Sequence, residues 1–587
     1  MHILGINAYH PDSSACIVKD GELIAAAEEE RFKRIKHWAG FPQESIKYCL
    51  KETRIKIEEL DYIALNRNPK ANFYKKVIFV LLNRPSLSLV KSRLSNMLRI
   101  ERIKDILSKE FSIPKRKIKA KICNIEHHRA HLASTFFVSP FEESAVVSLD
   151  GFGDFTSCMV AKGKDNRINV LYEINYPHSL GLFYTAFTQY LGFKKFGDEY
   201  KVMGLSAYGK PEYKKKMEEI LVLKPEGKFA LNLDYFSFYK RRDCMLWDNS
   251  EPLLDDVFSE KLTEIFGPPR KQEDEVSPYH CDLAASMQKI YEEVFFHILN
   301  YAYKITGISN LCLAGGCALN SLANGKIFDR TPFKEIYIQP GASDAGGSLG
   351  ACYYLYNHIL NEKRIFMMRE AYWGPSFSEP ELKNELNKNR GELEDNRCLV
   401  EKIEDKDELC SLTAKSISEG KIVGWFQGRM EWGPRALGNR SILVDPRRQE
   451  MKDILNARIK KREWFRPFAP SILLERTGEY FEKDYPEPFM LKVYRVKEDK
   501  KKIIPAVTHI DGTGRLQTIS KEENPLFWQL IKEFEKITGV PVLLNTSFNE
   551  NEPLVCKPQE AIDCFLRTNM DILVIGNYLI RKSDGVQ

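Results

Sequence analysis

Alternating apolar runs and polar turns at the start of the chain predict three consecutive β-strands. The apolar runs cover residues 3–6, 15–18 and 23–27, and a polar turn follows the first of them. The second and third runs are separated by Asp20-Gly21, and an Asp-Gly pair between apolar runs is a strong signal for a β-hairpin. The chain therefore opens as strand, turn, strand, hairpin, strand.

The same layout returns near residue 145. Apolar runs at 145–149, 157–161 and 168–172 are separated by an acidic, glycine-rich turn at 150–154 and a polar turn at 162–166. Two copies of one strand pattern predict a duplicated α/β unit. Turns at the ends of such strands commonly clamp a phosphate or a metal between the halves.

Helical spacing and glycine turns indicate further α/β structure beyond the second copy. Apolar residues at helical spacing predict a helix over 284–305, and buried strands are expected at 310–314 and 335–339. A glycine-rich turn follows each strand and leads into a helix. The pattern therefore favours an α/β fold for this region as well.

Two segments interrupt the α/β pattern. Residues 75–121, between the two copies, are rich in Lys, Arg and Leu, and we expect helices there with a solvated charged face. Residues 361–401 are polar and irregular, so we place a domain boundary there. The predicted domains are therefore residues 1–365 and residues 400–587.

Composition describes an ordinary folded protein of 587 residues, with 43% hydrophobic and 29% charged residues. The net charge of +6 is small beside 87 basic and 81 acidic side chains, which argues against a nucleic-acid partner and still permits local basic pockets. Thirteen cysteines include no CxxC pair, and no leader pattern follows Met1. We expect a cytoplasmic protein with reduced thiols and no membrane role, because the apolar run at 77–82 is too short to span a bilayer.

His127 and His131 form the sharpest local signal. Four residues apart on a helix, both rings leave one face and can share an ion, although surface histidines at a helix start would give the same spacing. Asp150 and Asp344 each lie in a turn after a predicted strand, where carboxylates can converge. Two imidazoles and two carboxylates suit Fe(II), Mn(II) or Zn(II) better than Ca(II). We expect the intervening His128 to point elsewhere, as a surface histidine or a support for the ligands.

Glycine pairs are the candidate phosphate-binding elements of the N-terminal domain. The chain has no GxxxxGK(S/T) loop and no GxGxxG after a strand. Gly315-Gly316 and Gly346-Gly347 each lie between a strand and a helix, where backbone N–H groups can reach an anion. Each pair alone is a weak signal, because many strand-to-helix turns need glycine for geometry only.

Arginines in glycine- and proline-rich turns mark the C-terminal domain. Guanidinium groups held by such turns are pre-organised for planar or bidentate anions, which phosphate and carbamate both are. A solvated helix face would instead alternate Lys and Glu. We therefore expect an anion pocket here, formed by Arg435, Arg440, Lys460, Arg462, Arg466 and Arg515, with Asn545 at the end of an apolar strand.

Five ordered blocks of sequence carry a family resemblance. They are Glu28-Glu-Glu-Arg-Phe with Lys36-His, His127-His-Arg-Ala-His, Tyr200-Lys-Val-Met-Gly, Gly315-Gly-Cys-Ala-Leu-Asn and Trp432-Gly-Pro-Arg-Ala-Leu-Gly-Asn-Arg-Ser. Together they resemble the O-carbamoyltransferase family that includes nodulation-factor, cephamycin and tobramycin carbamoyltransferases. The resemblance covers nearly the whole chain, and so many ordered blocks are far more specific than any one of them.

The resemblance implies a fold and a set of site residues. It implies an α/β fold with a duplicated actin/Hsp70-like (Kae1-like) N-terminal domain and a C-terminal domain similar to the YrdC/Sua5 fold. By motif position, the metal ligands are His127, His131, Asp150 and Asp344, and the family's metal is expected to be iron. The resemblance assigns the carbamoyl phosphate and nucleotide pockets to Gly315, Gly316, Asn320, Arg435, Lys460, Arg466, Arg515, Asn545 and Ser547.

The chemistry implied by the resemblance has two steps. Carbamoyl phosphate and ATP, with Mg²⁺, would give carbamoyl-adenylate in the C-terminal domain, and the carbamoyl group would then pass to a hydroxyl of a small-molecule acceptor at the N-terminal metal site. His10 or Asp12, in the first strand-turn, is the candidate general base, and Lys201 could touch a phosphate. The simpler roles of a turn histidine for His10 and a surface lysine for Lys201 stay open.

Three other functions stay open. An actin-fold kinase would use the duplicated sheet but would leave the C-terminal arginines without a purpose. A tRNA threonylcarbamoyl-type modifier is disfavoured by the modest net charge. A non-catalytic binding protein should have lost pocket residues, and every named position still has a competent side chain. The sequence does not specify the acceptor, and a homodimer is expected from base rates alone.

Overall fold

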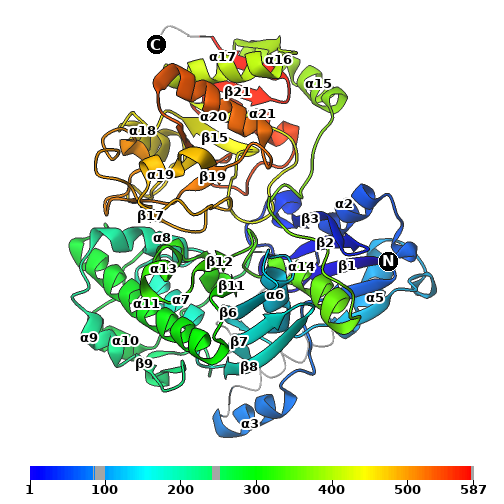
Figure 1. The fold of residues 1–587 in the computed structure, drawn as a ribbon, viewed down its shortest axis with the longest axis vertical. Coiled ribbons are helices and arrows are strands. Elements are labelled where there is room, and N and C mark those ends of the chain that lie inside the picture. Colours follow the sequence, from blue (N-terminus) through cyan, green and yellow to red (C-terminus); the bar gives the residue numbers. More distant parts are fainter. Residues whose placement is uncertain (84, 86–99, 241–250, 584–587) are drawn as a thin grey trace. The chain divides into compact units, whose positions relative to one another are not determined.

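The computed structural model describes residues 1–83, 85, 100–240 and 251–583, and the chain forms two compact units, Met1–Met368 and Arg369–Gln587 (Figure 1). Each unit combines β-sheet with helices, which confirms the α/β class. No helix among the described residues is long and apolar enough to cross a membrane. The predicted helical segment 75–121 lies partly outside the described residues.

The first sheet of the N-terminal unit contains the three strands predicted from the opening apolar runs. Its five strands are β1 (His2–Asn7), β2 (Ser14–Lys19), β3 (Glu22–Glu28), β4 (Tyr62–Leu65) and β5 (Lys121–Asn124). The order is β3-β2-β1-β4-β5, with an antiparallel meander from β1 to β3 and parallel pairing of β1, β4 and β5. The predicted hairpin turns at Asp20 and Gly21, which both have positive φ.

The second sheet repeats this topology. Its strands are β6 (Glu143–Gly153), β7 (Thr156–Lys164), β8 (Arg167–Asn175), β11 (Asn310–Ala314) and β12 (Glu335–Tyr337). The order is β12-β11-β6-β7-β8, again an antiparallel meander extended by two parallel strands. The repeat in the apolar pattern therefore recurs as two sheets with the same strand order and directions.

A helix follows the fifth strand of each sheet, α6 (His127–Phe136) and α14 (Gly346–Tyr353), and the two helices pack together (Figure 1). Gly350 allows the close approach, because a Cβ at this position would lie 1.8 Å from the carbonyl oxygen of Ala130. At the C-terminal end of α6 and in the turn that follows, the Arg364 guanidinium donates to four backbone carbonyl oxygens, where a positive charge is favourable. These carbonyls belong to Phe136, Phe137, Ser139 and Phe141.

The predicted helix over 284–305 is present and begins earlier than its apolar pattern. Helix α11 spans Pro278–Thr306. Pro278 stands at the first helical position, where the missing N–H costs nothing, and Ser277 forms a capping box with His280. The helix ends at Gly307, whose φ of 66° gives the left-handed cap.

The C-terminal unit is built on one eight-stranded sheet of order β13-β22-β21-β14-β15-β20-β16-β19. Helices α17 (Lys406–Ser418) and α20 (Pro525–Thr538) contact each other, and α21 (Pro558–Arg567) contacts β14 and β21. The strands are Cys398–Lys402 (β13), Val423–Phe426 (β14), Arg440–Val444 (β15), Ala469–Leu473 (β16), Gln517–Ile519 (β19), Val542–Ser547 (β20), Ile572–Ile575 (β21) and Tyr578–Lys582 (β22).

The prediction of an irregular stretch at 361–401 is wrong in its second half. Two helices, α15 (Glu379–Lys388) and α16 (Arg390–Asp395), and strand β13 lie there. The sequence contains the start signal of α15, since Ser378 and Glu381 form a capping box around a proline at the first turn. The polar composition gave no apolar pattern from which to predict α15, because this helix buries only Leu382 and Leu386.

Candidate active site

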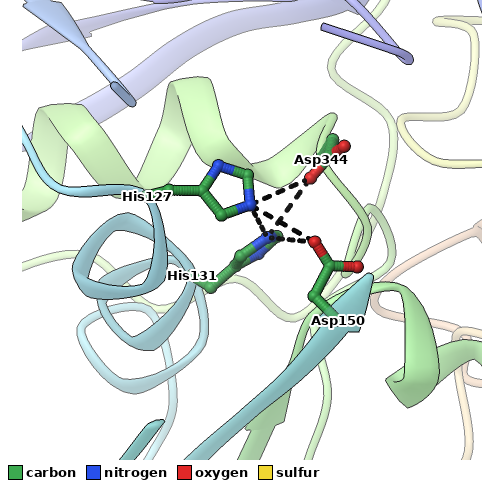
Figure 2. A group of neighbouring side chains, drawn as sticks. All are labelled: His127, His131, Asp150 and Asp344. Carbon is green, nitrogen blue, oxygen red and sulfur yellow. Dashed lines mark hydrogen bonds and ion pairs between the residues drawn. The ribbon is translucent and has the colours of Figure 1, made fainter. Parts of the chain in front are cut away.

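Two histidines and two aspartates meet inside the N-terminal unit. His127 Nε2 and His131 Nε2 lie 3.1 Å apart. Asp150 Oδ2 is 3.3 Å from His127 Nε2 and 3.5 Å from His131 Nε2, and Asp344 Oδ1 is 3.3 Å from both. All four residues are buried, and Figure 2 shows both rings turned toward the two carboxylates. The structure therefore brings together all four residues predicted as metal ligands.

Local structure explains why these side chains converge. Glu126 is the N-cap of α6 and accepts from the backbone N–H groups of His128 and Arg129, so the helix begins at His127. Asp150 lies in β6, where the pairing with β7 is interrupted between Leu149 and Gly153. Gly153 leaves space for the His127 ring, since a Cβ there would lie 2.1 Å from it. Asp344 precedes α14, and the packing of α14 on α6 brings it to the histidines.

The charges of the cluster stabilise one another. Burial lowers the pKa of His127, but Asp150 and Asp344 outweigh burial and raise it well above 6.5. Burial likewise lowers the pKa of His131, and the same carboxylates raise it. Burial raises the pKa of Asp344, but His10, His127 and His131 lower it well below 3.8. Burial and Asp344 raise the pKa of Asp150, but hydrogen bonds from His127 and His131 outweigh them and lower it below 3.8. Both carboxylates are therefore ionised and available to a cation.

The donor set fits a transition metal. One atom from each of the four residues lies within 4.8 Å of the others. The Nε2 atoms of His127 and His131 can form a hydrogen bond with each other only if one ring donates and the other accepts. A cation between the two rings would instead bind the Nε2 lone pair of each histidine. Two imidazoles with two carboxylates are the ligand types of Fe, Mn and Zn sites.

His128 is buried rather than on the surface, which corrects one of its two expected roles. Its Nδ1 lies 2.6 Å from Ser148 Oγ and its Nε2 lies 2.9 Å from the Thr156 carbonyl oxygen. Burial and the neighbouring His127 and His131 lower its pKa well below 6.5. His128 therefore points away from the cluster and ties α6 to strands β6 and β7, as a support for the ligands.

The two candidate bases occupy different positions beside the cluster. His10 Nδ1 lies 2.5 Å from Asp344 Oδ2, and its ring centroid is 5.3 Å from that of His127. Asp12 accepts from Ser343 Oγ at 3.1 Å and pairs with His37 Nδ1 at 2.7 Å. His10 thus contacts a predicted ligand directly, whereas the Asp12 carboxylate is engaged by His37 and Ser343.

The pair of Asp12 and His37 was not predicted as a unit. Both residues have left-handed backbones, with φ of 56° and 53°, and backbone strain of this kind concentrates at functional sites. The His37 backbone N–H also donates to Glu30 Oε2 at 2.7 Å. The only sequence signal for His37 was its place in the Lys36-His family block, and that block did not indicate a role.

Replacing His37 by glutamine is expected to lower the melting temperature near pH 6 and to have little effect above about pH 9. Burial lowers the His37 pKa, but Asp12 and Glu30 raise it from 6.5 to about 9. A histidine whose pKa is raised by folding stabilises the folded state. This stabilisation is complete below pH 6.5 and is lost as the pH rises through about 9. Thermal melts of the natural protein and of the His37→Gln variant across this pH range test the prediction. Asp12→Asn should give the same pH pattern, and a difference independent of pH would contradict the ion pair.

Lys201 lies in helix α8 (Glu199–Leu205) and is half-buried. Its Nζ lies 3.0 Å from Asp198 Oδ1 and 5.4 Å from the centre of the Phe193 ring. Lys201 is thus a partly buried lysine with an ion-pair partner, which is compatible with a structural role. Its role toward a phosphate stays a prediction.

The first glycine pair touches the cluster. The Gly316 N–H donates to Asp150 Oδ1 at 2.9 Å, and Gly315 has a φ of 91° and no room for a Cβ, which would lie 2.1 Å from the Leu149 carbonyl oxygen. Asn320 caps the following short helix α12 (Ser321–Gly325) and exchanges hydrogen bonds with Gln288 of α11. The turn predicted to hold a phosphate thus also orients one carboxylate of the candidate metal centre.

Guanidinium groups gather in the C-terminal unit. Arg515, which is half-buried, is repelled by Arg435, Arg462 and Arg466. Burial and this repulsion lower the pKa of Arg515 well below 12.5. Arg466 also pairs with Glu463 at 3.5 Å. Such a cluster of cations is destabilising alone and is relieved by a bound polyanion.

Lys460 is fixed by backbone and side-chain oxygens next to these arginines in sequence. The lysine is buried, and its Nζ donates to the Ser547 carbonyl oxygen and to Asn549 Oδ1 at 2.8 Å. Asn549 Oδ1 also accepts from Ser547 Oγ at 2.8 Å. Asn549 therefore joins two predicted pocket residues, and pattern reasoning missed it although it lies two positions after Ser547.

Two residues of the glycine-rich turn correct the predicted pocket. Arg440 is fully buried and donates to the carbonyl oxygens of Pro375, Gly428 and Asn439, so it holds the fold and does not belong to the anion pocket. The missed Glu431 accepts from the backbone N–H groups of Leu437, Asn439 and Arg440. This buried carboxylate shapes the turn that carries Arg435.

Asn545 in β20 offers a free acceptor. Its Nδ2 donates to Ser471 Oγ at 3.0 Å and to Gln517 Oε1 at 3.1 Å. Its Oδ1 is buried and has no hydrogen-bond partner among the described residues. An unpaired buried acceptor is costly, so a ligand donor at this atom is expected.

Comparison with known proteins covers both units. Residues 2–353 match the family model described as carbamoyltransferase N-terminus, and residues 414–582 match carbamoyltransferase C-terminus. An uncharacterised protein of Synechocystis sp. is 40% identical over 99% of this chain and 97% of its own length. The nodulation protein NolNO of Sinorhizobium fredii is 39% identical over 98% of this chain and 80% of its own length.

Solved structures are more distant. Component A of the (R)-2-hydroxyglutaryl-CoA dehydratase of Acidaminococcus fermentans is 15% identical, with a TM-score of 0.32 over 60% of this chain and 97% of that chain. HypF of T. kodakarensis is 13% identical, with a TM-score of 0.31 over 61% of this chain and 48% of that chain. These values are too low to support a conclusion about the present chain.

Proposed function

The chain belongs to the carbamoyltransferase family, and from that premise we propose that it is an ATP-dependent O-carbamoyltransferase. In the C-terminal unit, carbamoyl phosphate is hydrolysed to carbamate and inorganic phosphate, and the carbamate then attacks the α-phosphorus of ATP, with Mg²⁺, to give carbamoyl-adenylate and pyrophosphate. The carbamoyl group then passes to a hydroxyl of a small-molecule acceptor in the N-terminal unit, and AMP leaves. We propose a duplicated actin/Hsp70-like (Kae1-like) fold for the N-terminal unit and a YrdC-like fold for the C-terminal unit.

The observation that carries the transfer step is the convergence of His127, His131, Asp150 and Asp344. These residues would hold a divalent transition metal, with Fe(II) as the first candidate. When bound, such an ion supplies Lewis acidity for charge that develops on a carbamoyl oxygen. The protein's own contribution is rigidity, because Gly316 orients Asp150, and His128 anchors the helix that carries both histidines.

A hydroxyl acceptor must lose a proton during transfer. His10 is the candidate to receive it at Nε2, since Asp344 lies 2.5 Å from Nδ1 and fixes the orientation of the ring. Asp12 is the weaker candidate, because its two carboxylate oxygens already contact His37 and Ser343.

The C-terminal unit supports the activating step by its charge. Arg435, Arg466 and Arg515 would neutralise the phosphates of ATP and carbamoyl phosphate, and Lys460 with Ser547 would complete the pocket. The unpaired Oδ1 of Asn545 is suited to accept from the carbamoyl amide, which carries two N–H donors.

Pyrophosphate release from ATP and Mg²⁺ without an acceptor tests the activating step. We expect release that requires carbamoyl phosphate. ADP production independent of carbamoyl phosphate would instead support an actin-fold kinase. Release that requires L-threonine and bicarbonate, and product transfer to tRNA, would support the threonylcarbamoyl alternative.

Adding Fe(II), Mn(II) or Zn(II) to chelator-treated protein is expected to raise the melting temperature. At about 100 times the dissociation constant, binding to the folded state alone adds about 2.7 kcal/mol, or roughly 3 °C for a unit of this size. Asp344→Asn should lose most of this shift, because it removes one ligand charge. An equal shift in the variant would place the ion elsewhere.

A further inference from the structure

Helix α3 (Phe73–Asn83) presents an apolar face to solvent. Seven of its eleven residues are exposed, by 39 to 76%, and every one of them is aliphatic or aromatic. At 3.6 residues per turn these seven side chains form one continuous face. The face consists of Phe73, Tyr74, Val77, Ile78, Val80, Leu81 and Leu82.

The opposite face fastens α3 to the N-terminal unit. Lys75 Nζ donates to the Glu173 carboxylate and, at 3.2 Å, to Asn175 Oδ1. The Phe79 ring lies 5.6 Å from that of Phe155 and 5.3 Å from that of Tyr176, measured between centroids. The helix is therefore held with its charged side inward and its apolar side outward, the reverse of an ordinary surface helix.

We propose that the apolar face of α3 is the contact surface for a second copy of this chain. Seven side chains at these exposed fractions present on the order of 800 Å² of accessible surface, which is what one partner contributes to a stable interface of standard size. The centres of such interfaces are depleted of charge, and both lysines of α3 are partly buried on its other side.

Two further arguments favour a second copy over a lipid surface. Helices that lie on membranes carry Lys and Arg on the face that meets the headgroups, whereas Lys75 is engaged by Glu173 and Lys76 donates to the Pro69 carbonyl. In a two-fold pair whose axis is perpendicular to α3, the helix meets itself in antiparallel direction. The aromatic Phe73 and Tyr74 of one helix then face Leu81 and Leu82 of the partner subunit.

Light scattering after size exclusion is the test, on the full chain. We expect a mass twice the chain's 67.9 kDa for the natural sequence and for Leu253→Glu, a control leucine outside α3 that is 65% exposed. The double variant Leu81→Glu, Leu82→Glu should run as a monomer, because two like charges would face the partner's apolar side chains. Its melting curve, with the control's, establishes that it is folded.

Each alternative occupant gives a different result. A dimer that persists in the double variant would overturn the proposal, as would a monomeric natural protein. If that monomer binds vesicles of anionic phospholipid, the face is a lipid surface instead. If the monomeric natural protein melts well above the double variant, residues of the same chain cover the face. None of these results depends on the proposed activity.

Discussion

Replacing His131 by alanine is expected to abolish carbamoyl transfer while leaving carbamoyl-phosphate-dependent pyrophosphate release intact. His131 contributes one of four converging ligands, and its Nε2 lies within 3.5 Å of His127, Asp150 and Asp344. Loss of a residue that only supports a metal ligand costs about 10- to 100-fold in affinity or activity, so loss of a ligand itself should exceed about 100-fold.

Metal content and transfer rate are measured together for this variant. Transfer is followed as consumption of enzyme-formed carbamoyl-adenylate by a panel of hydroxylic acceptors, and metal content by elemental analysis. His297→Ala is the matched control, because this histidine of α11 lies outside the cluster and contacts the Lys224 carbonyl oxygen at 2.8 Å. Undiminished transfer by His131→Ala would remove the cluster from the mechanism.

Replacing Arg515 by alanine should have the converse effect, abolishing pyrophosphate release while metal stays bound. An arginine that stabilises a phosphoryl transition state is worth about 10³-fold or more in rate. The control is Arg495→Ala, which removes the same charge from the strand β17 (Tyr494–Arg495) that pairs with β18 (Thr513–Gly514), next to Arg515. The control should retain activity.

For Arg515→Ala we also expect an effect on stability that replacement of a purely structural arginine would not produce. Because Arg435, Arg462 and Arg466 repel this guanidinium, its removal should leave the ligand-free protein as stable as before, or more stable. Carbamoyl phosphate or ATP should then raise the melting temperature less than in the natural protein. A large loss of stability in the ligand-free variant would indicate that Arg515 supports the fold and not a ligand.

Local patterns predicted the elements that depend on neighbours in sequence. The Asp20-Gly21 hairpin, the paired strand layouts and the helical spacing of His127 and His131 are all present. The contacts that pattern reasoning missed join residues far apart or reverse the expected direction of a side chain. His37 reaches back to Asp12, and Arg440 turns inward to carbonyl oxygens where its glycine-rich turn had indicated an anion pocket. No periodicity reports which way a side chain in a turn points.

The matching topology of the two sheets has a consequence for how the centre is assembled. Helices α6 and α14 occupy equivalent places, each following the fifth strand of its sheet. His127 and His131 belong to the first copy, whereas Asp150 and Asp344 belong to the second. Neither copy alone has the full set, so the centre depends on the packing of α14 on α6, which brings the two sets of ligands together. A fragment that contained only one of the two sheets would therefore lack the centre even if it folded.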